Sequence, residues 1–270
     1  MMTEKVKTTN RGNIHYWIND KKDNNITLVL LPGLTADHRL FAQQVSHFEN
    51  EYQVFVWDAP AHGKSRPFEY TFSIMEKAEY LHEIFRDEKI DKPIIIGQSM
   101  GGYVGQAFVE KYPEDLVGLI LIDSAPLQRK YVTAAEIWLL KRMEPVYRAY
   151  PWKTLLKSGV NGTAYSEYGQ KLIYQIWSGY DKYEFSKLSG HGYRILAEAM
   201  EADLAYEIKC PALLICGEHD KAGSVQRYNR KWTENTGIPL VWIPDAGHNS
   251  NTDNPDFVNR EIEKFLSDIE

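Results

Sequence analysis

The sequence predicts an α/β fold: a mostly parallel, twisted sheet of about eight strands flanked by helices. Short β-rich apolar runs recur along the 270 residues, and from the third run onward most are separated by segments with helical spacing. Several runs lack polar and apolar alternation, as expected of strands covered by helices on both faces. This length suits one large α/β domain that carries an insertion as well as it suits two domains.

Seven runs are predicted as strands because they are short, apolar and rich in β-branched residues. The first two precede any helical pattern, whereas the later ones follow the strand-helix-strand order of a parallel sheet. In chain order the predicted strands span 13–18, 26–31, 53–58, 93–97, 117–123, 212–217 and 240–243.

Two helices can be recognised by residue spacing. Ser73 and Glu76 form a capping box, and the apolar residues that follow share one face of the predicted helix. Pro255 suits a first helical position, and apolar residues then repeat at helical spacing as far as Ile269. Both segments are predicted to pack on the sheet.

Between residues 126 and 195 the alternation of strands and helices stops, and the chain becomes helical and rich in Tyr and Trp. We interpret this block as a helical cap over the carboxyl edge of the sheet, inserted into a core made of 1–125 and 196–270. Its rings either pack within the cap or line a partly hydrated pocket. Candidates for the pocket are Met100, Trp138, Trp152 and Trp177.

Composition narrows the class of partner. The formal net charge is -6 and the basic residues form no long run, which argues against a general nucleic-acid binder and leaves a small-molecule substrate as the expected partner. No stretch approaches the roughly 18 apolar residues of a membrane span, and the N-terminus lacks the apolar region of a signal peptide. We therefore expect a cytoplasmic protein, of an oligomeric state that the sequence leaves open.

The sequence predicts neither a disulfide nor a cofactor. Cys210 and Cys216 lie at either end of one predicted strand, about 20 Å apart at about 3.3 Å per residue, so they cannot bridge within it. No histidines and acids show metal-ligand spacing, and no phosphate-binding or dinucleotide fingerprint occurs. We therefore expect no metal and no cofactor.

The pentapeptide Gly97-Gln98-Ser99-Met100-Gly101 lies between a β-branched run and a helical segment. A serine with glycine two residues away on each side predicts a nucleophile elbow, a strand-to-helix turn so tight that side chains beside the nucleophile would clash. This turn would point the Ser99 hydroxyl toward solvent or substrate. Ser99 is therefore the candidate nucleophile.

A serine hydroxyl needs a base, and the base needs a carboxylate that fixes its tautomer and stabilises its charged form. Asp220 follows the predicted strand 212–217, and His248 lies in the loop after the next strand. Three other residues compete with Asp220 for the acidic role or its place. These are Glu218, two residues earlier, and Asp123 or Ser124, which follow the strand 117–123.

These motifs resemble the α/β-hydrolase family over essentially the full length of the chain. The matching pieces are the elbow, Leu31-Pro32-Gly33-Leu34, Asp58-Ala59-Pro60-Ala61-His62-Gly63-Lys64-Ser65, Gly217-Glu218-His219-Asp220 and Gly247-His248. The resemblance implies that Ser99 is the nucleophile, His248 the general base and acid, and Asp220 the orienting carboxylate.

The resemblance also implies an oxyanion hole made of two backbone N–H groups, which map to Met100 and to Leu34 or its neighbour Thr35. Pro32 stands where many relatives carry a histidine that supports this loop. His62 matches a structural turn of the family. His191, between two glycines, is interpreted as a solvent-facing turn residue, with reach from the cap toward substrate as the alternative.

The leading functional hypothesis is a serine hydrolase that cleaves a small or medium carboxylic ester through an acyl-enzyme. Hydrolysis of a C–C bond, a lactone or an amide by the same triad is the alternative within enzymes. Relatives that attack haloalkanes or epoxides carry Asp at the nucleophile position, where this chain has Ser99. A small-molecule sensor on a hydrolase scaffold is the alternative from another class.

Overall fold

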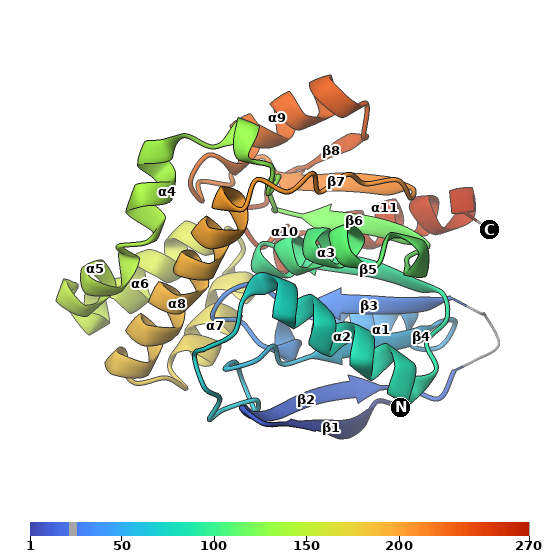
Figure 1. Ribbon diagram of the computed structural model, residues 1–270, viewed down its shortest axis with the longest axis horizontal. Helices are drawn as coiled ribbons and strands as arrows, with labels where there is room; N and C mark the ends of the chain where they lie inside the picture. The colour runs from blue at the N-terminus through green and yellow to red at the C-terminus, as the bar shows by residue number, and fades with distance from the viewer. Residues whose placement is uncertain (22–25, 270) are drawn as a thin grey trace.

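The computed structural model describes residues 1–21 and 26–269. One eight-stranded sheet runs through it in the order β1-β2-β4-β3-β5-β6-β7-β8 (Figure 1). β2 pairs antiparallel with β1 and β4, and the remaining neighbours are parallel, which confirms the predicted fold class. The strands are β1 (Thr3–Thr9), β2 (Gly12–Ile18), β3 (Thr27–Leu31), β4 (Gln53–Trp57), β5 (Pro93–Gln98), β6 (Gly118–Ile122), β7 (Ala212–Gly217) and β8 (Leu240–Ile243).

Helices cover both faces of the sheet. In Figure 1, α2 and α3 lie in front of it, and α1 and α11 lie behind it. The helices that flank the sheet are α1 (Ala42–Phe48), α2 (Ile74–Glu88), α3 (Met100–Lys111), α9 (Val225–Thr236), α10 (Ser250–Asp253) and α11 (Pro255–Ile269). Short 3-10 turns are η1 (His38–Phe41), η2 (Pro113–Asp115) and η3 (Arg129–Tyr131).

The central strands of the sheet have no exposed side chains. β3, β5 and β6 are buried along their whole length, and Ile94 of β5 is paired with both Leu28 and Gly118. Helices on both faces account for this continuous burial. The central strands were predicted to within one or two residues, whereas β1 was not predicted. It is an exposed edge strand whose Lys5 and Lys7 pair with carboxylates of α2.

Helices α2 and α11 begin where the sequence predicted. Ser73 and Glu76 form the predicted capping box, with hydrogen bonds of 2.9 and 3.1 Å between each side chain and the other residue's backbone N–H. Pro255 opens α11, as predicted.

Cys210 and Cys216 are both free. Among the helices described, none has the length and apolar character needed to cross a membrane.

Five helices gather beyond the carboxyl ends of the parallel strands (Figure 1). The last of them runs to Glu201, past residue 195, where the inserted block was predicted to end. The chain then returns to the sheet at β7. We call helices α4 to α8 the cap: α4 (Ala134–Leu140), α5 (Met143–Ala149), α6 (Trp152–Thr163), α7 (Glu167–Trp177) and α8 (Lys182–Glu201).

A lysine is buried where α2 meets the cap. Lys77 is 1% exposed, and its ammonium group lies 5.3 Å from the centroid of the Phe72 ring. In the described residues, no carboxylate forms an ion pair with it. Burial lowers the pKa of Lys77 from 10.5 to about 7 because the charged form loses its hydration. This buried amine therefore opposes folding at neutral pH.

Replacing Lys77 with Met is expected to raise the free energy of unfolding near neutral pH by about 2 to 4 kcal/mol. Between about pH 7 and 10.5 the unfolded chain binds a proton that the folded state does not, so wild-type stability rises with pH. The gain from Lys77→Met should therefore shrink as the pH rises. Urea unfolding at two pH values in this range measures both effects, with the exposed Lys209→Met as control. An equal gain at both pH values would contradict the assignment.

Candidate active site

Ser99 stands at the junction of β5 and α3 in a conformation that few residues adopt. Its φ of 49° and ψ of -114° place it in a strained region of backbone space. The turn is closed by glycine, because a Cβ on Gly101 would lie 1.9 Å from the carbonyl oxygen of Leu31. The predicted nucleophile elbow is therefore present in the structure, with Ser99 at its apex.

Three of the predicted residues come together at this edge of the sheet. The Ser99 Oγ lies 2.9 Å from His248 Nε2, and His248 Nδ1 lies 3.0 Å from Asp220 Oδ2. Asp220 follows β7, and His248 lies in the loop that follows β8. With Nδ1 donating to the carboxylate, Nε2 is left as an acceptor for the serine hydroxyl. This geometry fits proton transfer from Ser99 to His248.

The Asp220 carboxylate raises the pKa of the His248 imidazole. Burial alone would lower the pKa of His248, but the Asp220 carboxylate outweighs it through charge and hydrogen bonding, with a smaller effect of Asp123 in the same direction. The pKa of His248 therefore lies above its ordinary value of 6.5. A raised pKa makes the imidazole a stronger base toward Ser99.

The other acids proposed from the sequence occupy different places. Glu218 is exposed, and the Ser124 hydroxyl donates to the carbonyl oxygen of Ser99 at 2.9 Å. Asp123 is buried and accepts hydrogen bonds from the Gly217 N–H at 2.8 Å and from the N–H and hydroxyl of Ser250 at 2.8 and 2.7 Å. Asp123 therefore joins the loops of Asp220 and His248, and does not contact the imidazole.

Asp123 and Asp220 are also close to each other. Their carboxylate oxygens and the Cys216 Sγ all lie within 4.8 Å of one another. Burial, together with the charge of Asp220, raises the pKa of Asp123. Burial and the two carboxylates likewise raise the pKa of the Cys216 thiol. This cysteine is thus an inert part of the core.

Sequence reasoning missed the role of Gln98. Its buried amide Nε2 donates to the His248 carbonyl oxygen at 2.6 Å and to Asn249 Oδ1 at 3.0 Å. The residue beside the nucleophile thus fixes the loop that carries the imidazole. Gly33 leaves room for it, because a Cβ there would lie 2.3 Å from Gln98 Oε1. Only the position of Gln98 inside the elbow could have drawn attention to it.

Two backbone N–H groups near Ser99 are free to bind an anionic oxygen. Met100 begins α3, and neither its N–H nor that of Leu34 donates to a protein acceptor within residues 1–21 and 26–269. Leu34 and Met100 both line the pocket described below, whereas Thr35 is buried and its hydroxyl donates to the Leu34 carbonyl oxygen at 2.5 Å. Leu34 lines the pocket and Thr35 does not, so Leu34 stays the predicted donor.

A pocket of about 360 Å³ opens between the cap and the core beside Ser99 and His248. Most of its lining is apolar, including Met100, Leu140, Met143, Leu196, Met200 and Val225. Met100 was an expected lining residue. The three tryptophans proposed for this role are absent from the lining. Trp152 and Trp177 pack on Phe185 with ring centroids 5.3 and 5.0 Å apart, and Trp138 is 57% exposed.

Two histidines of the sequence analysis lie outside the Ser99 site. His62 is buried, and its Nδ1 lies 2.9 Å from the carbonyl oxygen of Pro60, in keeping with a structural role. His191 was expected in a solvent-facing turn, but it is buried within α8, so that expectation was wrong. Burial lowers the pKa of both imidazoles to about 3. Both are therefore neutral at physiological pH.

Potential metal-ligating groups among the described residues already have hydrogen-bond partners. Asp37, His38 and Asp58 bring three such atoms within 4.8 Å of one another, as do Asp123, Cys216 and Asp220. Asp58 accepts hydrogen bonds from the backbone N–H groups of His38 and Lys64, at 2.8 and 2.7 Å. The Asp58 carboxylate is thus held by backbone hydrogen bonds.

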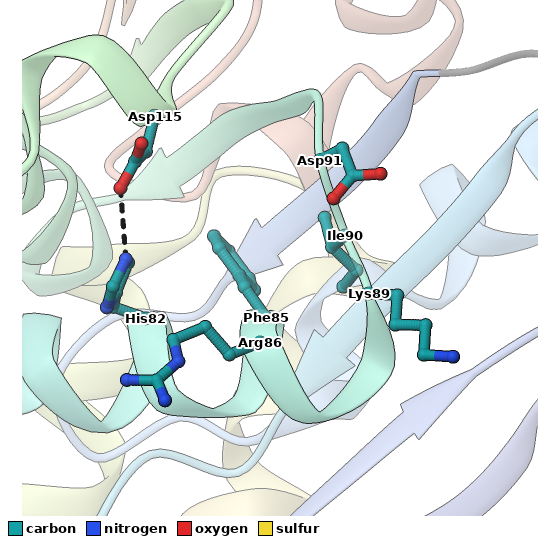
Figure 2. A pocket seen from close by; sticks show the side chains of 7 residues that line it. All are labelled: His82, Phe85, Arg86, Lys89, Ile90, Asp91 and Asp115. Carbon is teal, nitrogen blue, oxygen red and sulfur yellow. Dashed lines mark hydrogen bonds and ion pairs between the residues drawn. The ribbon is translucent and has the colours of Figure 1, made fainter.

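A second hollow lies at the opposite edge of the sheet (Figure 2). Ile90 and Asp91 in its wall precede the first residue of β5, whereas Ser99 follows the last. His82 points toward Asp115 across the hollow, with its Nε2 3.0 Å from the carboxylate. The described lining of this hollow holds no serine, threonine or cysteine beside that imidazole, so it does not repeat the arrangement of Ser99 and His248.

Comparison with known proteins identifies the family. A model of the Alpha/beta hydrolase family matches residues 28–261. The chain is 27% identical over 283 residues to a 2-hydroxy-6-oxononadienedioate/2-hydroxy-6-oxononatrienedioate hydrolase of Burkholderia vietnamiensis, covering 94% of this chain and 90% of that protein.

Solved structures share the fold. A thermophilic esterase from Thermogutta terrifontis superposes with a TM-score of 0.80 and 21% identity, covering 100% of this chain and 99% of that one. The enol-lactonase from Burkholderia xenovorans LB400 gives a TM-score of 0.78 and 24% identity, covering 97% and 100%.

The coupling between His248 and Asp220 can be measured without a substrate. NMR titration of the His248 ring protons is expected to give a pKa above 6.5 in the wild type. In Asp220→Asn we expect a lower value, because burial then acts without the main opposing charge. Glu218→Gln, which removes an exposed carboxylate two residues away, serves as control. An unchanged pKa in Asp220→Asn would assign the charge effect to Asp123.

Proposed function

The chain belongs to the alpha/beta hydrolase family, and we propose that it is a serine hydrolase that cleaves carboxylic esters through an acyl-enzyme. One observation carries the proposal: the hydrogen-bonded series Ser99, His248 and Asp220 opens onto an apolar pocket between cap and core. A positioned nucleophile and base beside a pocket for an apolar group are what ester hydrolysis requires.

In the first half of the reaction, the Ser99 oxygen attacks the ester carbonyl carbon while His248 Nε2 takes the hydroxyl proton. Negative charge then develops on the carbonyl oxygen, where the N–H groups of Leu34 and Met100 can stabilise it. The bond from carbon to the alcohol oxygen breaks, and His248 returns the proton to the departing alcohol. The acyl group remains on Ser99.

In the second half, water takes the place of the serine. His248 removes a proton from the water as its oxygen attacks the acyl carbon, and then gives that proton to the Ser99 oxygen as the acid leaves. Asp220 keeps its negative charge and stabilises the imidazolium in both halves. Gln98 and Asp123 act as positioning residues, since they contact the loops that carry His248 and Asp220.

A second candidate is hydrolysis of a lactone or of a C–C bond by the same residues. It is supported by the names of similar proteins, an enol-lactonase and a dienedioate hydrolase. The acyl-enzyme route to an ester and to a lactone uses the same groups, so a panel of ester, lactone and diketone substrates separates these candidates. Slow, single-turnover hydrolysis together with ligand-dependent thermal stabilisation would favour a sensor.

Ser99→Ala is expected to lower ester hydrolysis by about 10⁴-fold or more and to abolish labelling by a fluorophosphonate, because no other group replaces the nucleophile. Short para-nitrophenyl esters and mass spectrometry of the labelled protein measure the two effects. Ser158→Ala, at an exposed serine of the cap, is the matched control. If no short ester is hydrolysed and Ser99 is not labelled, the proposal is wrong.

Asp220→Asn and Asp123→Asn should fail in different ways. We expect Asp220→Asn to lower kcat by about 10³- to 10⁴-fold with little change in melting temperature, since the imidazole loses its orienting charge. Asp123→Asn removes an acceptor of buried hydrogen bonds and should lower the free energy of unfolding by about 1 to 3 kcal/mol. Steady-state kinetics and thermal melting distinguish the two. Intact turnover in Asp220→Asn, with turnover abolished in a stable Asp123→Asn, would reverse the assignment.

A further inference from the structure

One charged residue lines a pocket wall that is otherwise neutral apart from His248. Among the described lining residues, Glu136 is the only acid, and neither lysine nor arginine is present. The carboxylate thus lies in the same pocket as Ser99 and His248. The Glu136 side chain is 34% exposed, so water screens part of its charge, and a carboxylate on a substrate in the pocket would meet the remainder.

Glu136 is fixed in place at the seam between cap and core. It is the third residue of α4, where its Oε2 accepts from the Thr133 N–H and hydroxyl at 2.9 and 2.7 Å. Its Oε1 accepts from the Tyr228 hydroxyl and lies 3.4 Å from the Arg227 guanidinium, both on α9. The cap and the core therefore hold the carboxylate from opposite sides.

These contacts also keep Glu136 ionised. Partial burial would raise the pKa of Glu136, but hydrogen bonds from Thr133 and Tyr228 and the charge of Arg227 hold it below its ordinary value. Arg227 is 67% exposed and does not line the pocket, so water screens part of its charge and it compensates Glu136 incompletely on the pocket side. The pocket side of this cluster is therefore negative.

We propose that Glu136 is a specificity-determining residue, a fixed anion that excludes acyl groups carrying a carboxylate and admits uncharged apolar ones. The inference rests on the proposed ester hydrolysis at Ser99. This specificity would differ from that of the similar dienedioate hydrolase, whose named substrate carries two carboxylates. Two like charges in one pocket repel, and its described lining holds neither lysine nor arginine to compensate them.

The test compares two para-nitrophenyl esters of matched shape. One is the monoester of adipic acid, and the other is its uncharged isostere, in which an isopropyl group replaces the terminal carboxylate. We expect wild-type kcat/KM to favour the isostere by about tenfold or more, after subtraction of spontaneous hydrolysis. Higher ionic strength should narrow this ratio.

Two substitutions should move the ratio in opposite directions. Glu136→Gln removes the charge yet keeps an acceptor for Thr133, so we expect the preference for the isostere to fall by about three- to tenfold. Arg227→Gln removes the partly compensating cation, so we expect the preference to increase. Glu207→Gln, at a side chain that is 72% exposed and outside the pocket lining, should leave the ratio unchanged.

The outcomes separate this inference from the proposed function. If neither ester is hydrolysed, ester hydrolysis itself is wrong. If both are hydrolysed with similar kcat/KM by the wild type, or if Glu136→Gln and Arg227→Gln leave the ratio unchanged, the role of Glu136 is overturned. Thermal melting of each variant establishes that it is folded, and Arg227→Gln remains a test if Glu136→Gln is unstable.

Discussion

The candidate site depends on one buried carboxylate whose hydrogen bonds go to the surrounding loops and not to the imidazole. Asp123, at the end of β6, accepts hydrogen bonds from Gly217 at the end of β7 and from Ser250 after the loop of His248. Parallel strands bring their carboxyl ends to a common edge, but the loops beyond them need a further restraint. Asp123 supplies it from one side, and Gln98 supplies it from the other through the His248 carbonyl group.

The sequence predicted those parts of the molecule whose causes are local. The strand 93–97 is buried on both faces and therefore reads as a continuous apolar run. β1 has no fully buried residue and its valine, Val6, is exposed between two partly buried lysines, so it shows no apolar run and was missed. Ser99, Asp220 and His248 could be placed because each follows a strand in a fixed order. The catalytic roles of these residues remain predictions.

Contacts between distant segments could not be predicted. Gln98 meets the His248 loop 150 residues later, and Glu136 meets Tyr228 at a separation of 92. His191 was misplaced because its flanking glycines suggested a turn. In the structure both glycines lie inside helix α8. A Cβ on Gly190 would lie 2.3 Å from the Glu144 Cβ, and one on Gly192 would lie 2.4 Å from Leu34 Cδ1. Close packing, not turn geometry, explains the small residues there.

These close approaches bear on how such a protein can diverge. Helix α8 lines the pocket with Tyr193, Leu196 and Met200, yet it is clamped at Gly190 and Gly192 against α5 and the Leu34 loop. A mutation that shifts this helix disturbs the machinery around Ser99 at once. Helix α4 carries pocket residues such as Leu139 and holds no glycine in a contact of this kind. The size of the pocket can therefore be altered through α4 with less disturbance of the Ser99 surroundings than through α8.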